Sequence, residues 1–245
     1  MSLLVILCVL FVFFRAEILL RVATLGGPRR VMAEVSRHQH VVSRKIFLLA
    51  RLFSGMRVTM EGLSRALPPV FLVVSNHQSL IDIPALATAF PCRNLRYVAK
   101  RELKRGLPYI SLALRVGQHA LISRKTDYRQ GMRELARFAA LSETGICPVV
   151  FPEGTRSRTG AVNSFQAGAF RIVLERCPMA VLSVAVDGGY RLATVPGLLR
   201  NLRGARYRIK ALTLYPAPKG KREIMALLTR IEAEITSEIQ GWRVE

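Results

Sequence analysis

The sequence predicts an α/β fold with a mostly parallel central sheet flanked by helices, preceded by a helical N-terminal module. Three observations lead to this prediction. Short apolar runs alternate with amphipathic stretches from residue 67 onward, which is typical of an α/β domain. The first 55 residues instead carry one apolar run and then a basic, helix-periodic stretch. The chain is also both apolar (51% hydrophobic residues) and strongly basic, with a formal net charge of +21.

The length and the charge limit the possible classes of protein. A chain of 245 residues suits one domain with a full hydrophobic core, and we expect 1–55 to dock it on a membrane and 56–245 to form the α/β domain. A basic protein binds polyanions, either nucleic acid or an anionic membrane surface. Aromatic residues make up only 7% and form no stacking platform, so we expect a membrane partner and no nucleic acid.

The N-terminal apolar run has two possible arrangements. Residues Ser2–Phe14 are apolar, and Arg15, Glu17 and Arg21 interrupt the run that follows. The uninterrupted part is shorter than the ~20 residues that cross a bilayer, and its charges follow the run, which argues against a signal peptide. The segment is therefore either a single span extended by snorkelling side chains or a helix lying in one leaflet. Basic residues over 29–51 predict that the following chain stays on the cytoplasmic side.

A second helix is expected after the breaker Gly26-Gly27-Pro28, over residues 31–53. Its apolar residues gather on one side, with basic residues between them. Such a helix either lies on a membrane surface or packs on the domain with a solvated basic face.

The remaining chain alternates between two periodicities. Strands are expected at 70–74, 95–99, 120–122, 146–151, 181–186 and 207–214, and helices at 81–89, 128–141, 167–176 and 222–242. Strands that alternate with helices favour parallel pairing, because a parallel connection needs a crossover.

A histidine follows the first of these strands, in the run SNHQSLID at residues 75–82. Ligands in α/β proteins gather beyond the carboxyl ends of the strands. On a continuous helix His77 and Asp82 would point about 140° apart, so they meet only if the turn folds back. Asp82 would then hold one imidazole nitrogen and leave the other as a general base for a substrate hydroxyl. No third or fourth ligand lies nearby in sequence, so a metal site is not expected.

A second motif, FPEGTRS at residues 151–157, also follows an apolar strand directly. Its proline and glycine favour a tight turn, and Glu153 and Arg156 project from that turn. A guanidinium beside free backbone N–H groups is a good phosphate site, although a solvated loop with a local salt bridge would have the same pattern.

Together the two motifs resemble the glycerophospholipid acyltransferase family, in particular the 1-acylglycerol-3-phosphate acyltransferases. The runs VAKREL at 98–103 and ALISR at 120–124 resemble the family's intermediate blocks, and the resemblance covers residues 58–188. The chain departs from the family pattern at Ser123, where an acidic residue is frequent, and at Ser183, where proline is usual. The strand around Ser183 lies on the acyl-donor side in such enzymes, so this departure concerns donor preference.

The resemblance implies transfer of an acyl group from a thioester of coenzyme A or acyl carrier protein to a lysophospholipid hydroxyl. The acceptor would be above all 1-acyl-sn-glycerol-3-phosphate, and the product phosphatidic acid. His77 would be the base and Asp82 would stabilise its imidazolium. No metal or other cofactor would be needed.

The resemblance also implies a substrate-binding set. Arg156, with Arg124 and Lys100, would bind the substrate phosphate, and Gly154 and Thr155 would complete the binding turn. Glu153 would position either Arg156 or a glycerol hydroxyl.

Two alternatives remain open at this level. The acceptor could be another lysolipid, such as lysophosphatidylinositol or lyso-ornithine lipid, because pocket shape decides the headgroup. The chain could also be a catalytically silent membrane scaffold that keeps the fold.

Overall fold

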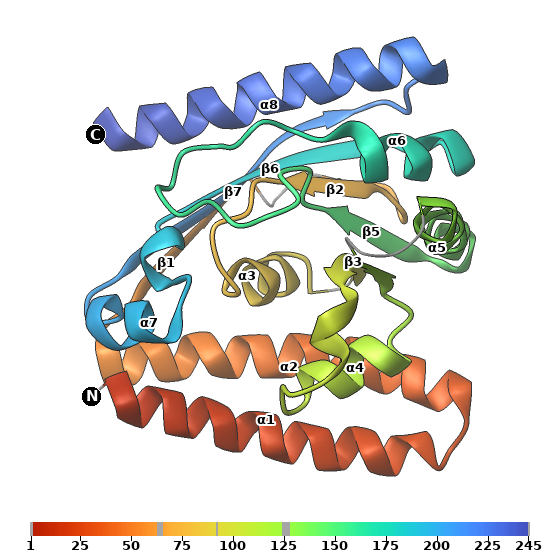
Figure 1. Ribbon diagram of the computed structural model, residues 1–245. Helices are drawn as coiled ribbons and strands as arrows, with labels where there is room; N and C mark the ends of the chain where they lie inside the picture. The colour runs from red at the N-terminus through yellow and green to blue at the C-terminus, as the bar shows by residue number, and fades with distance from the viewer. Residues whose placement is uncertain (1, 63–65, 92, 124–127, 245) are drawn as a thin grey trace.

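The computed structural model describes residues 2–62, 66–91, 93–123 and 128–244 (Figure 1). The described residues form one seven-stranded sheet in the order β1-β7-β6-β2-β5-β3-β4. The strands are β1 (Arg57–Glu61), β2 (Leu72–Ser75), β3 (Asn94–Lys100), β4 (Ala120–Ile122), β5 (Ile146–Val150), β6 (Val181–Asp187) and β7 (Arg206–Tyr215). Strands β6, β2, β5, β3 and β4 are parallel, whereas β7 is antiparallel to β6 and parallel to β1. The predicted α/β fold with a mostly parallel sheet is confirmed.

Helices cover both faces of this sheet. They are α1 (Ser2–Thr24), α2 (Pro28–Ser54), α3 (Asp82–Ala89), α4 (Ile110–Val116), α5 (Tyr128–Ala140), α6 (Ala167–Arg176), α7 (Val195–Asn201) and α8 (Gly220–Val244), with short 3₁₀ turns η1 (Arg101–Lys104), η2 (Leu141–Thr144) and η3 (Tyr190–Leu192). Helices α5, α6 and α8 share one buried apolar cluster with the sheet, and α3 and the α1–α2 pair contribute to the cluster on the other face. Figure 1 shows these two helical layers above and below the strands.

Local sequence signals set the helix ends. Helix α2 begins at Pro28, whose fixed φ suits a first helical position, and ends at Ser54, where Gly55 follows with a left-handed φ of 66°. The long α8 buries a stripe at helical spacing, made of Ile224, Leu228, Ile231, Ile235 and Ile239.

Every strand and helix predicted from periodicity is present within a few residues of its expected bounds. Three further elements, β1, α4 and α7, were not predicted. Strand β1 is an edge strand whose side chains alternate between exposed and half-buried, so it lacks a clear apolar run. Helix α7 has only seven residues and contains Gly197, a poor helix former.

The two N-terminal helices pack against each other and against the α/β domain. Helix α2 lies between α1 and the rest of the molecule, contacting α3 and α4, so it packs on the domain and is not a free surface helix. Helix α1 runs unbroken past Arg15, and its Glu17 accepts hydrogen bonds from Arg21 and from the Tyr109 N–H. The proposed division between residues 55 and 56 stays a prediction.

Helix α1 exposes an apolar face. Residues Leu3–Thr24 are long and apolar enough to cross a membrane by length and composition, and few of them are buried. Nine large apolar side chains of this segment are exposed: Leu3, Leu4, Leu7, Leu10, Phe11, Phe14, Ile18, Leu19 and Val22. An exposed apolar face of this size is typical of a surface that binds a membrane or another protein.

Ser183 has a structural role in the sheet. The register of β6 against β7 shifts between Leu182 and Val184, and there the Ser183 hydroxyl accepts the Thr213 N–H at 3.1 Å. The same hydroxyl donates to Glu234 of α8 at 2.5 Å. A proline could supply neither bond, so the serine suits this bulge.

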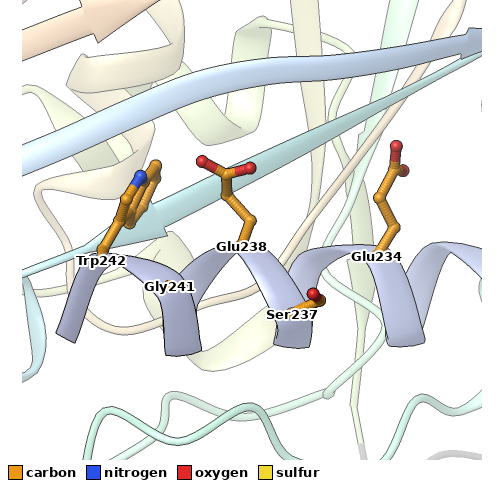
Figure 2. Close-up of a pocket in the computed structure, with 5 residues that line it drawn as sticks. All are labelled: Glu234, Ser237, Glu238, Gly241 and Trp242. Atoms are coloured by element: carbon orange, nitrogen blue, oxygen red, sulfur yellow. The ribbon is translucent and has the colours of Figure 1, made fainter. Parts of the chain in front are cut away.

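The face of α8 that meets β7 is held by polar contacts. Glu234, Glu238 and Trp242 line a hollow of about 310 Å³. Figure 2 shows these side chains projecting from the same face of α8. Lys210 donates to Glu238 at 2.7 Å, and the Arg208 guanidinium lies 5.9 Å from the centre of the Trp242 ring. This hollow contains no predicted site residue, and its carboxylates are bonded within the chain.

A buried histidine predicts how stability depends on pH. Burial, followed by the nearby Arg96 charge, lowers the pKa of His119 to about 3, and its Nδ1 accepts the Tyr97 N–H. The folded state therefore binds fewer protons than the unfolded state between pH 3 and 6.5. We expect this group to lower the free energy of unfolding as pH falls through that range, by up to about 1.4 kcal/mol per pH unit.

Chemical denaturation across this pH range measures the effect. The variant His119→Asn keeps an acceptor for Tyr97 N–H and cannot titrate, so its stability should vary less with pH. An equal pH dependence in both proteins would contradict the assignment.

Candidate active site

His77 and Asp82 meet at the carboxyl edge of the sheet. His77 lies in the turn after β2, and Asp82 is the first residue of α3. The turn folds back, so that His77 Nδ1 lies 2.7 Å from Asp82 Oδ2 although the two residues are five apart. The His77 ring stacks on Phe151 with centroids 4.2 Å apart, and its side chain is 16% exposed. A hydrogen-bonded Nδ1 leaves Nε2 as the nitrogen available to a substrate.

Asp82 is completely buried and is surrounded by donors. Its Oδ2 accepts the backbone N–H groups of Gln78 at 2.6 Å and Ser79 at 2.8 Å, and its Oδ1 accepts the Tyr207 hydroxyl at 2.9 Å. A buried carboxylate is costly unless it is hydrogen-bonded, and these donors meet that need. Burial and the nearby Asp82 carboxylate raise the pKa of Tyr207 well above its usual value, so the phenol remains a donor.

The second motif holds the backbone of His77 on both sides. The His77 N–H donates to Glu153 Oε1 at 2.6 Å, and the His77 carbonyl accepts the Ser157 N–H at 2.8 Å. The two motifs therefore form one unit, because β2 and β5 are neighbours in the sheet and end at the same edge.

Glu153 contacts the chain and not Arg156. It is 5% exposed, and its Oε2 accepts two bonds from Asn163, one from the backbone N–H and one from the side-chain amide. Among the described residues its bonded partners are thus His77 and Asn163, so of the two predicted roles the contact with Arg156 is not made, and the contact with a glycerol hydroxyl stays a prediction. Burial raises the pKa of Glu153, and the hydrogen bonds from His77 and Asn163 oppose that rise.

The rest of the turn faces outward. Gly154 has a φ of 64°, a conformation that favours glycine, and it is exposed together with Thr155 and Arg156. The Arg156 Nη1 donates to the carbonyl of Ala193, between η3 and α7, at 2.9 Å. Arg156 is therefore both exposed at the site and bonded to the segment after β6.

The structure places Lys100, one of the two other basic residues predicted to bind the phosphate. Lys100 is the exposed last residue of β3, so it lies at the same edge of the sheet as His77, with β5 between their strands. Arg124 lies outside the described residues.

Gln78 connects the His77 turn to two other segments, the loop after β5 and the end of β6. Its buried Nε2 donates to the Gly160 carbonyl at 3.1 Å and to Asp187 Oδ1 at 2.9 Å, and its Oε1 accepts the Gly189 N–H at 3.0 Å. Arg243, near the end of α8, donates to the same two acceptors at 2.9 and 3.0 Å. The last turn of α8 thus braces the loop that carries the second motif.

Sequence reasoning missed Tyr207, Asn163, Gln78 and Arg243. Gln78 belongs to the first motif, but nothing local distinguishes the others. In the part of the chain that the structure describes, no three histidine, cysteine or acidic side chains gather to hold a metal. The expectation that no metal or cofactor takes part stays a prediction.

Comparison with known proteins adds to this geometry. A model of the family described as Acyltransferase matches residues 57–187. The chain belongs to the acyltransferase family. The match contains both motifs and ends before β7, so Tyr207 and Arg243 lie outside it.

This acyltransferase is similar in sequence to 1-acyl-sn-glycerol-3-phosphate acyltransferases of other organisms. It is 33% identical to 1-acyl-sn-glycerol-3-phosphate acyltransferase alpha of Mus musculus over 55% of this chain and 47% of the relative. It is 27% identical to the chloroplastic 1-acyl-sn-glycerol-3-phosphate acyltransferase of Arabidopsis thaliana over 71% of this chain and 48% of the relative. The matched segments thus span about half the length of these two relatives.

A solved structure has the same fold. The crystal structure of the 1-acyl-sn-glycerophosphate acyltransferase PlsC of Thermotoga maritima superposes with a TM-score of 0.70 at 23% identity, covering 100% of this chain and 99% of the other. The whole architecture, including the N-terminal helices and α8, is therefore shared.

Replacing Glu153 tests how the two motifs are joined. In Glu153→Gln the amide keeps one acceptor oxygen, and its NH₂ must face either the His77 N–H or the Asn163 donors. Two opposed donors in a buried position cost about 1–3 kcal/mol, so we expect the turn to shift and acyl transfer to fall at least about tenfold. Glu143→Gln, on the exposed η2 turn, is the matched control. Normal rates in Glu153→Gln would refute the proposed positioning.

Replacing Arg243 tests the brace from α8. Arg243→Met removes the bonds to Gly160 and Asp187 while the buried stripe of α8 stays intact, so we expect kcat to fall about three- to tenfold with KM little changed. Arg243→Lys should restore part of kcat, and Arg222→Met, exposed on the same helix, should have no effect. A loss of stability with unchanged kcat would mean that Arg243 acts on folding alone.

Proposed function

We propose that this acyltransferase moves a fatty acyl group from a thioester to the free hydroxyl of a lysophospholipid, above all 1-acyl-sn-glycerol-3-phosphate. The product would be phosphatidic acid. The contact of 2.7 Å between His77 and the buried Asp82, at the sheet edge shared with the second motif, carries the proposal. The two relatives named above are 1-acyl-sn-glycerol-3-phosphate acyltransferases, which supports this choice of acceptor.

In this mechanism His77 is the general base. With Nδ1–H donated to Asp82, Nε2 accepts the proton of the acceptor hydroxyl as its oxygen attacks the thioester carbon. Asp82 remains in place and stabilises the imidazolium, which is the role of the carboxylate in hydrolytic triads. Here the substrate supplies the nucleophile.

The second half of the reaction returns the proton. The tetrahedral intermediate collapses, the carbon–sulfur bond breaks, and the leaving thiolate takes the proton from the His77 imidazolium. The new ester bond and the free thiol balance the hydroxyl and the thioester that are consumed. The thiol belongs to coenzyme A or to acyl carrier protein, and both donors are compatible with this chemistry.

The phosphate of the acceptor would bind the exposed guanidinium of Arg156. Its Nη1 is bonded to Ala193, which holds the side chain at the site and favours binding without further loss of side-chain freedom. Lys100 would add charge from the end of β3, and Arg124 would do so from the segment after β4. Glu153 acts in this proposal as a positioning residue for His77, since its hydrogen bonds are to the chain.

The proposed reaction takes place at a membrane. The exposed apolar face of α1 would lie in one leaflet, on the cytoplasmic side, so that the site meets lipid substrates at the surface. The packing of α1 against α2, and the bond from Tyr109 to Glu17, favour a helix that lies in the leaflet beside the domain over a separate span.

An acyl-transfer assay with His77→Ala tests the proposal. Purified protein in liposomes is offered labelled acyl-coenzyme A or acyl carrier protein thioester with a panel of lysophospholipids. Removing a general base typically costs about 10²- to 10⁴-fold in rate, so we expect transfer to lysophosphatidic acid to fall by that factor. His40→Ala, a histidine on α2 outside the site, should keep the wild-type rate.

The assay separates the alternatives. Transfer only to lysophosphatidylinositol or lyso-ornithine lipid, lost in His77→Ala, would keep the mechanism and change the acceptor. A folded wild-type protein that transfers to no acceptor would favour a silent scaffold.

A further inference from the structure

A second basic site lies next to the proposed active site, beyond the end of β6. A hollow of about 410 Å³ opens between η3, α7 and the start of β7, and four arginines line it: Arg191, Arg200, Arg203 and Arg206. No acidic residue is among its lining residues, and all four arginines are exposed. The hollow lies outside the segment matched by the family, which ends at residue 187.

The positive charge in this hollow is not neutralised within the described residues. No ion pair with a described residue is found for Arg200, Arg203 or Arg206. Asp187 lies just before the hollow in sequence, but it is bonded to Arg243 and Gln78. Like charges held close together repel, and planar guanidinium groups bind phosphate by paired hydrogen bonds. The hollow therefore favours a phosphate-bearing anion.

The surroundings of the hollow indicate where that anion comes from. Helix α7 exposes two apolar side chains, Val195 at 62% and Leu199 at 42%, and it packs against α1. Figure 1 shows α7 beside the N-terminal end of α1. If the apolar face of α1 lies in the acyl layer, α7 and the hollow lie near the headgroups. Apolar and basic side chains side by side are typical of a protein surface that binds anionic lipid.

The hollow is also connected to the site. Its Gly188 precedes Gly189, where an added Cβ would lie 2.9 Å from Ser79 Oγ and 3.1 Å from Asp82 Oδ1. Arg156 donates to Ala193 in the same segment. A ligand in the hollow would thus hold the segment that packs on Asp82 and Arg156.

We propose that this arginine-lined hollow binds the phosphate headgroup of an anionic phospholipid of the membrane. The bound lipid fixes the orientation of the active-site edge toward the lipid surface. It is a docking site, separate from the acceptor site at Arg156; it rests on the proposed placement of α1 in the membrane and not on the proposed acyl transfer.

Vesicle flotation of the full chain tests the site. Binding is measured to vesicles of phosphatidylcholine alone and to vesicles that also contain phosphatidic acid. The gain is the ratio of the second binding to the first, and it is compared between the wild-type chain and its variants. In the triple variant Arg200→Gln, Arg203→Gln, Arg206→Gln the gain should be at least about tenfold smaller than in the wild-type protein. The control Lys219→Gln, Lys221→Gln, Arg222→Gln removes the same charge from exposed positions just before and within the first turn of α8, and it should keep the wild-type gain. Equal gains in the two triple variants would overturn the site.

Vesicles that contain oleate at matched surface charge distinguish phosphate recognition from attraction to any anionic surface. The hollow variant should lose more of the phosphatidic acid gain than of the oleate gain. Equal losses would overturn a headgroup site. If the triple variant does not fold, the three single variants decide: each should lower the gain about fivefold, and unchanged gains would reject the proposal.

Discussion

The structure of the site depends on the burial of the Asp82 carboxylate. A charge removed from water must be matched by hydrogen bonds, and Asp82 obtains them from the folded-back turn at Gln78 and Ser79 and from Tyr207 on β7. The same donors fix the direction of the carboxylate, and the carboxylate in turn fixes the imidazole of His77. The candidate base is thus oriented by a part of the fold that lies far away in sequence.

The two motifs are linked because each completes the hydrogen bonding of the other. Glu153 and Ser157 take up the N–H and the carbonyl of His77, and without them these backbone groups would have no regular partner in the turn. The rigidity of the site then comes from adjacent parallel strands and not from one loop. Gln78 and Arg243 both bond to Asp187, which extends the same network to the last turn of α8. A helix at the end of the chain thus contributes to the position of His77.

Exposed apolar and basic side chains lie next to each other on this protein. The exposed face of α1 is apolar, α2 separates it from the sheet, and four exposed arginines gather beside α7 at the same edge as His77. A net charge of +21 alone would fit several polyanions. Its position next to an exposed apolar helix favours a lipid surface, where substrates of the proposed reaction are found.

Local patterns in the sequence determined the two motifs and every strand and helix except β1, α4 and α7, because apolar period and turn chemistry act over a few neighbouring residues. They also predicted the contact between His77 and Asp82, which needs only a folded-back turn. Only the tertiary structure decided the hydrogen-bond partners of Glu153 and the bond from Tyr207 to Asp82. The same is true of the bond from Arg243 to the loop at Gly160 and of the packing of α2 on the domain. Each of these joins residues from separate elements, and their distance depends on strand order and helix packing, which no local pattern encodes.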